Sequence, residues 1–173
     1  HHIFFTYDGS ETNGGVTIYI DGISQSLTPV GTWPTTTIQA VSDLLIGARY
    51  TDVNWWDGEM DDFRIFSIEL SQAQILQLYN SGAGTEKPLS DTEIIHVSFD
   101  DGTSYDDTGN ANIPTITGNE TYNTTGIIGT SFDLDGSTYI SYENEDLYDI
   151  YPGTKYSIAL WVKVSSAQAA DSV

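Results

Sequence analysis

The 173-residue chain contains no cysteine. This absence excludes a disulfide framework, a thiolate nucleophile and a cysteine-ligated zinc site. Basic residues are also scarce, with 5 lysines and arginines against 25 aspartates and glutamates, and the formal net charge is −20. Nucleic acids and anionic membrane surfaces are therefore poor partners, because both need a positively charged footprint. No apolar run approaches the ~20 residues that span a bilayer.

Apolar residues make up 39% of the chain and aromatic residues 12%, which is enough to form a buried core. The acidity has two interpretations. It keeps the protein dispersed in water, including salty water, or a few of its carboxylates bind divalent cations. We favour the first interpretation for most of the acidic residues.

Short apolar stretches alternate with turn sequences, a pattern typical of antiparallel sheets. Asp21-Gly22, for example, closes a stretch that reads as the first strand of a hairpin. The predicted strands lie in the ranges 3–7, 16–20, 23–27, 43–47, 94–102, 139–141 and 156–164. Their short length and close spacing predict an antiparallel sandwich.

The stretch 55–71 organises the first half of the chain. It begins with a turn at Asp57-Gly58 and continues as a strand. The apolar positions of this strand are Met60, Phe63, Ile65 and Ile68. Ser71 is placed to cap a short helix over 72–80, whose apolar stripe should pack on the sandwich. The apolar stripe consists of Ile75, Leu78 and Tyr79.

These motifs resemble the end of a laminin-G-like module, of the concanavalin A-like lectin/glucanase superfamily. In that family a "DG.ID-[DE]-[VF]-RIY" strand runs into an "LS..EI..LY" helix. The corresponding residues here are Asp57-Gly58, the run 60–66, Leu70-Ser71, Ile75 and Leu78-Tyr79. Family-like motifs at 1–9, 18–22 and 46–49 precede them in the expected order.

The second half of the chain resembles the beginning of such a module. The family patterns there are a strand entering an aspartate turn, then "D-SGN-N", "G--G-A--FDG---Y-" and "-[FY]SI--WVK-". They correspond to residues 94–102, 106–112, 129–139 and 156–163. The resemblance therefore implies the C-terminal half of a module in 1–82, a linker in 83–93, and the N-terminal half of a module in 94–173.

Two arrangements explain this swapped order. In a tandem array, the sequence covers the C-terminal half of one module and the N-terminal half of the next. In a circular permutation, both halves belong to one sandwich, with 83–93 joining its first and last strands. The fold implied in either case is all-β. It is an antiparallel two-sheet jelly-roll sandwich of the concanavalin A-like type, with one short helix near residues 72–80.

The superfamily also contains glucanases, in which an E-x-D-x-x-E strand carries the nucleophile and the general acid on one face. The closest match here is the run from Glu59 to Arg64, and Arg64 stands where the second glutamate belongs. The run 143–146 fails as well. We therefore expect no enzymatic activity.

A calcium site is the predicted cofactor site. Oxygen-bearing side chains crowd the loop 105–112, around the bend at Gly109, and suit a hard cation. In relatives this loop lies beside the acidic last strand, so the predicted metal ligands are Asp107, Asn110, Asn112, Asp61 and Asp62. The alternative is an Asx-rich turn that caps itself. An ion here would be structural.

Aromatic side chains on loops are the candidate ligand-binding residues. Tyr50 and Trp55 are predicted to contact a glycan by stacking on sugar rings, and Trp33 lies in another loop. Trp56 and Trp161 are assigned to the core instead. His1-His2 are native or a tag remnant, and His2 is expected to be a hydrogen-bonded histidine at the core edge, not a ligand.

The function expected from these features is a non-catalytic extracellular module for binding or adhesion. Its partners would be a glycan or protein ligand and neighbouring modules of a longer, repeat-containing surface protein. The alternative is a structural spacer or decoration domain of a surface fibre, sheath or virion.

Overall fold

The computed structural model describes residues 1–31, 43–50, 53–87, 89, 92–110, 112–123, 125–143 and 153–165. Trp33 lies outside these residues, as do parts of the 83–93 and 143–146 stretches. The strands are β1 (His2–Tyr7), β2 (Val16–Ile20), β3 (Ile23–Ser24), β4 (Leu44–Ile46), β5 (Ala48–Tyr50), β6 (Val53–Trp55), β7 (Asp57–Phe66), β8 (Glu93–Val97), β9 (Pro114–Thr117), β10 (Tyr122–Asn123), β11 (Ser131–Asp135), β12 (Tyr139–Tyr142) and β13 (Tyr156–Val164). The helices are α1 (Gln72–Tyr79) and two 3-10 turns, Asn13–Gly15 and Asn80–Gly82.

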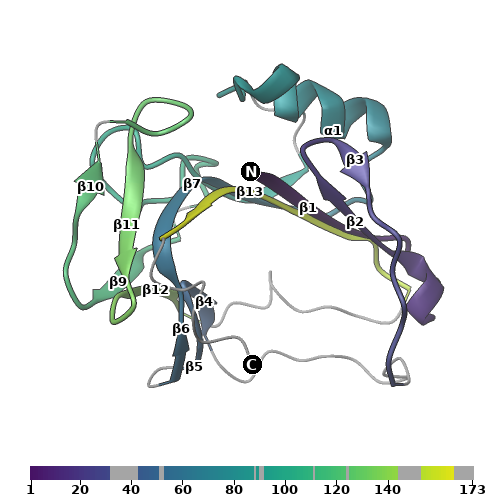
Figure 1. The fold of residues 1–173 in the computed structure, drawn as a ribbon, viewed down its shortest axis with the longest axis horizontal. Coiled ribbons are helices and arrows are strands. Elements are labelled where there is room, and N and C mark those ends of the chain that lie inside the picture. Colours follow the sequence, from purple (N-terminus) through teal and green to yellow (C-terminus); the bar gives the residue numbers. More distant parts are fainter. Residues whose placement is uncertain are drawn as a thin grey trace.

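The main sheet interleaves strands from both halves of the chain (Figure 1). Its strand order is β10-β11-β7-β13-β1-β2-β3, and β8 also pairs with β7. The late strand β13 therefore lies between two early strands, with Trp161 opposite Asp61 on one side and opposite His2 on the other. All of these pairings are antiparallel.

A smaller sheet, β4-β12-β9, packs against one face of the main sheet on the side of β7 and β11 (Figure 1). The buried core between them is apolar and aromatic. Its residues include Ile46, Met60, Phe63, Ile95, Phe132, Leu134 and Ile140. The fold is thus the antiparallel, concanavalin A-like β-sandwich that the family resemblance implied.

Helix α1 covers the opposite face of the main sheet, which we call the outer face (Figure 1). It starts at the N-cap expected at Ser71, whose hydroxyl accepts from the Gln74 backbone N–H, and the Gln74 side chain completes a capping box. Ile75 and Leu78 are buried against Phe4 and Phe66, which confirms the predicted apolar stripe. The helix ends at Asn80 in the left-handed conformation, a usual C-terminal signal.

A β-bulge in β7 explains an irregular spacing in the sequence. Met60 and Phe63 are three positions apart, so strict alternation would place them on opposite faces. The register shifts between Ala159 and Trp161 of β13, and Asp62 has a φ of 50°. The inserted residue brings both apolar side chains to the core, and Asp61 and Asp62 occupy consecutive positions beside the bulge.

The 83–93 stretch is attached to the sandwich through Arg64, which is fully buried. Its guanidinium donates to the carbonyl oxygens of Thr85 at 2.6 Å and Lys87 at 3.4 Å. It also donates to the Glu93 carboxylate at 3.0 Å. The described part of the stretch expected to be a linker is therefore anchored to β7.

Candidate functional site

The loop predicted to bind calcium directs many of its polar groups to its own backbone and to β8. The Asp106 carboxylate accepts from the backbone N–H groups of His96 and Thr108 and from the Asn112 amide. Asp107 accepts from the Ser98 N–H, and the Asn110 amide donates to the Ile94 carbonyl. These bonds match the self-capped turn that was the alternative to a metal site.

Asp62 belongs to a buried ion-pair network on the outer face, which we call the Arg64 network (Asp62, Arg64, Glu93 and His96). Its carboxylate accepts from Arg64 Nη2 at 2.8 Å and from His96 Nε2 at 2.7 Å. Burial would raise the pKa of Asp62, but the hydrogen bond from His96 and the Arg64 charge outweigh it and lower the pKa. Asp62 is thus ionised and already paired.

Asp61, the neighbouring residue, is 3% exposed and only half satisfied. Its Oδ2 accepts from the backbone N–H groups of Ile127 at 2.7 Å and Ile128 at 3.0 Å. Its Oδ1 has no hydrogen-bond partner. Burial raises the pKa of Asp61 to about 7, against the effect of the two N–H donors.

The five predicted metal ligands therefore have different hydrogen-bond partners, and the pKa values of Asp61 and Asp62 shift in opposite directions. Within the described parts of the chain, no group of three or more His, Asp or Glu side chains is placed to hold a metal ion. Among the five predicted ligands, Asp61 has a buried oxygen, Oδ1, that lacks a partner among the described residues and that a cation would satisfy. The calcium site stays a prediction.

The predicted aromatic site lies on the small β5–β6 hairpin. Tyr50 ends β5 opposite Val53, and its side chain lies outside the described part of the structure. The Trp55 ring is half-buried and packs against Tyr139, with ring centroids 5.3 Å apart. Contact of these residues with a glycan stays a prediction. Trp56 packs against the core, as expected.

A row of three buried side chains crosses the outer face and forms a second polar cluster. We call it the unpaired row: Asp61 on β7, Trp161 on β13 and His2 on β1. The His2 and Trp161 rings stack with centroids 4.3 Å apart and planes 3° apart. Six buried side-chain nitrogen and oxygen atoms lack partners among the described residues, and four of them are in this row: both His2 ring nitrogens, Trp161 Nε1 and Asp61 Oδ1.

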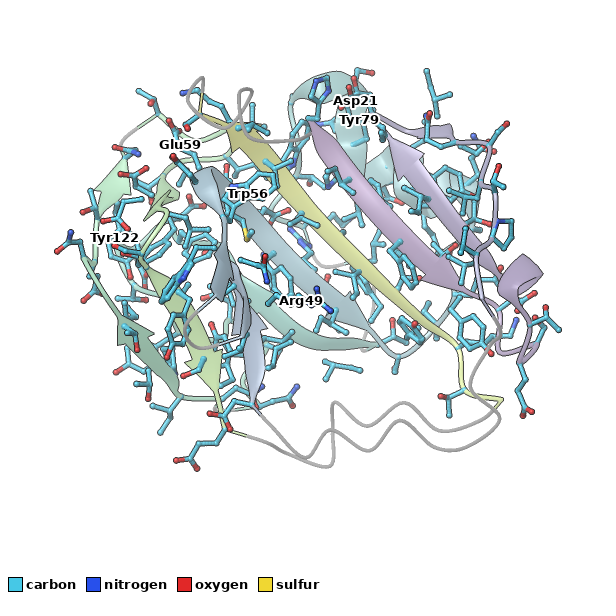
Figure 2. All side chains as sticks on the ribbon, turned by 60° about the horizontal axis from the view of Figure 1, so that its bottom comes forward. Asp21, Arg49, Trp56, Glu59, Tyr79 and Tyr122 are labelled. Atoms are coloured by element: carbon cyan, nitrogen blue, oxygen red, sulfur yellow. The ribbon has the colours of Figure 1, made fainter. Side chains whose placement is uncertain are left out.

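The expectation for His2 needs a correction. It is fully buried, but its ring makes no hydrogen bond. Burial lowers the pKa of His2 to about 3, so the imidazole is neutral at pH 7. The backbone N–H of His2 instead donates to Asp21, and Figure 2 shows Asp21 and Tyr79 together at this end of the sheet.

A cavity of about 450 Å³ opens beside the row. Its walls come from the ends of β7 and β13 and from the loop 125–127. The lining residues are His1, Glu59, Met60, Asp61, Thr125, Gly126, Ile127, Ser131, Trp161, Val162, Lys163 and Val164. Glu59, labelled in Figure 2 on β7 beside the yellow strand β13, pairs with Lys163 at 2.6 Å and accepts from Ser131 at 3.1 Å.

This cavity was missed at the level of sequence, apart from Asp61. Trp161 is predicted to be a core residue, and its 4% exposure supports this. Its indole N–H, however, is buried without a partner among the described residues, which the sequence does not indicate. Loop 125–127 has no motif. A weak signal was available in the closely spaced acidic residues Glu59, Asp61 and Asp62, which one would not expect in a central strand unless each had a partner.

The fold and the site together define a β-sandwich domain with a cavity and without an evident catalytic pair of carboxylates among the described residues. Residues 1–76 match a laminin-G family model described as the concanavalin A-like lectin/glucanases superfamily. This match supports a laminin-G-like module, a type of domain that generally serves in binding and is typically non-catalytic. The chain has no significant match among curated proteins or solved structures. None of its described helices has the length and apolar character of a membrane span.

Proposed function

We propose that the protein is a non-catalytic binding module of an extracellular or surface-exposed protein, with a glycan or protein ligand. The observation that carries this proposal is the cavity beside Asp61 and Trp161, where buried polar atoms lack partners. Buried polar groups are normally satisfied, and an exception at a cavity points to a ligand. Laminin-G-like domains are commonly extracellular, which agrees with this setting.

The chemistry of β7 supports a non-catalytic role. A retaining or inverting glycosidase needs two carboxyl groups facing the scissile bond. Here Arg64 occupies the position of the second glutamate and is fully buried in its network. Glu59 is engaged by Lys163 and Ser131.

The functional unit in this proposal is one sandwich made from both stretches of the chain, as in the circular permutation. Its support is the position of β13 between β7 and β1, together with the anchoring of Thr85 and Lys87 by Arg64. Residues 1–92 and 93–173, which together keep the partners of Arg64, should therefore be unfolded as separate fragments and regain strand structure when mixed. Far-UV circular dichroism measures this, and a fragment that folds cooperatively alone would favour the tandem array.

The ligand proposal is tested on glycan and peptide arrays with the parent protein, Ile127→Lys and Trp55→Ala. Ile127 is 50% exposed at the cavity rim, so the lysine tests the cavity without disturbing the core. We expect Ile127→Lys to lose binding and Trp55→Ala to keep it. Loss in Trp55→Ala alone would move the site to the β5–β6 hairpin predicted from the sequence.

Two further results would contradict the proposal. Hydrolysis of β-glucans by the purified protein would make it an enzyme. Regular self-assembly without any array signal would favour the structural alternative, a spacer or decoration domain of a fibre, sheath or virion.

A further inference from the structure

We propose that the cavity beside Asp61 takes a lysine or arginine side chain from a basic segment of a partner protein, with the Asp61 carboxylate meeting its charge. This inference rests on the proposed binding function and names the class of ligand. It follows from the charges, the walls and the surroundings of the cavity.

The other ionisable side chains that line the cavity already have partners. Lys163 Nζ lies 2.6 Å from Glu59 Oε1, and His1 Nδ1 lies 2.6 Å from Asp21 Oδ2. Asp61 lines the cavity, and its buried Oδ1 has no hydrogen-bond partner among the described residues. The lining residues therefore offer one uncompensated acceptor to a ligand, and a charge-assisted hydrogen bond from a cationic donor satisfies it.

The walls fit the aliphatic part of a basic side chain. Met60, Trp161 and Val162 supply apolar surface, and the half-exposed Ile127 and Val164 form an apolar rim. Lysine and arginine bury their methylene groups along such surface while the charged head reaches a polar group. A cavity of about 450 Å³ accommodates such a side chain.

A metal ion fits this cavity less well. Calcium takes 6–8 oxygen ligands. The described residues contain no group of three or more candidate carboxylate or histidine ligands, and much of the cavity wall is apolar. One carboxylate on an apolar wall matches an organic cation better.

The net charge of the chain agrees with a basic partner. A formal charge of −20 attracts positively charged segments and repels anionic ligands over the Debye length. Long-range attraction does not distinguish one basic segment from another. Specific recognition must therefore come from the contacts that a basic side chain makes inside the cavity.

The probe is a fluorescein-labelled peptide, Gly-Lys-Gly-Lys-Gly-Lys-Gly, measured by fluorescence polarisation with chelator present. The matched probe carries norleucine at the three lysine positions, which keeps the aliphatic stem and removes the charge. We expect the lysine peptide to bind at least about tenfold more tightly, as one charged hydrogen bond predicts.

Three variants locate the interaction. Asp61→Asn and Ile127→Lys should each weaken binding of the lysine peptide about tenfold or more. Glu143→Gln, at an exposed residue that follows β12 in the other sheet, replaces a carboxyl by an amide as Asp61→Asn does, and should change binding less than about twofold. Circular dichroism checks that each variant is folded.

The outcomes separate this inference from the proposed function. If both peptides bind the parent equally and Ile127→Lys weakens both, the cavity remains a binding site. The inference that it takes a basic side chain would then be wrong. Equal weakening by Asp61→Asn and Glu143→Gln would reduce the effect to net charge and overturn it as well. In the absence of chelator, calcium that displaces the lysine peptide from both the parent and Glu143→Gln, but not the residual peptide from Asp61→Asn, would assign Asp61 to a metal instead. Failure of the arrays and of both peptides would reject the proposed function too.

Discussion

Asp61 and Asp62 are neighbours in one strand, yet they have opposite environments. Asp62 receives Arg64 and His96 in a buried network, and its pKa is lowered. Asp61 keeps one oxygen without a partner, and burial raises its pKa to about 7. The bulge places the two carboxylates side by side and allows them different partners.

The two carboxylates illustrate two kinds of buried polar group: those paired within the fold, and those left without a partner among the described residues. The Arg64 network ties β7 to β8 and to the 83–93 stretch, so its charges are compensated by the fold itself. In the unpaired row, four buried polar atoms lack partners among the described residues, and two of its members, Asp61 and Trp161, line the cavity. An unsatisfied buried group costs stability, and the ligand that we propose would satisfy the one at Asp61.

The largest effect is expected from breaking the Arg64 network. Arg64→Met leaves Asp62 and Glu93 buried without their cation, and we expect a loss of about 3 to 5 kcal/mol in the free energy of unfolding. Urea unfolding measures it. Lys155→Met, which removes an exposed ion pair with Glu69, is the control and should stay within about 1 kcal/mol. A comparable loss in both variants would contradict a special role for the network.

The opposite change is expected at Asp61. The folded pKa of about 7 lies above the ordinary 3.8, so the stability that Asp61 contributes is complete below pH 3.8 and is lost as the pH rises through 7. Asp61→Asn removes this loss and should be more stable than the parent by roughly 2 to 4 kcal/mol at pH 8. At pH 4 the difference should nearly vanish. Urea midpoints of the parent and the variant at the two pH values test this. A stability difference that does not change with pH would contradict the raised pKa of Asp61.

Calcium comes next in expected size. If the ion predicted from the sequence binds only the folded state, it adds roughly 2.7 kcal/mol at a hundredfold excess over Kd. The melting temperature should then be higher with calcium than with chelator, and Asp107→Ala should erase the difference. A parent protein whose melting temperature ignores chelator would leave the loop as a self-capped turn.

The smallest expected effect compares two histidines. His2→Phe keeps a stacked ring on Trp161 and removes two unpaired nitrogens, so we expect unchanged stability or a gain of about 1 kcal/mol. His96→Phe takes a partner from Asp62 and should cost roughly 1 to 3 kcal/mol. Thermal melts of both variants check the signs. Equal losses would mean that the two rings contribute in the same way.

Much of the fold was predictable because strands and caps have local signals. The alternation in 156–164, the Asp21-Gly22 turn and the Ser71 cap all produced the expected elements. The unpaired row was not predictable, because its members come from three strands whose adjacency depends on the sheet order. The family resemblance suggested that the early and late strands meet, but it gave no information on which polar atoms remain without partners.

The most direct test is a carbon-13 NMR titration of the side-chain carboxyl groups of Asp61 and Asp62, with and without the lysine peptide. We predict a midpoint near pH 7 for Asp61 in the free protein and one below 3.8 for Asp62. The peptide should lower the Asp61 midpoint, because a bound cation favours the carboxylate, and leave Asp62 unchanged. Midpoints near 4 for both residues, or a peptide that shifts neither, would contradict the distinction between the paired and the unpaired carboxylate.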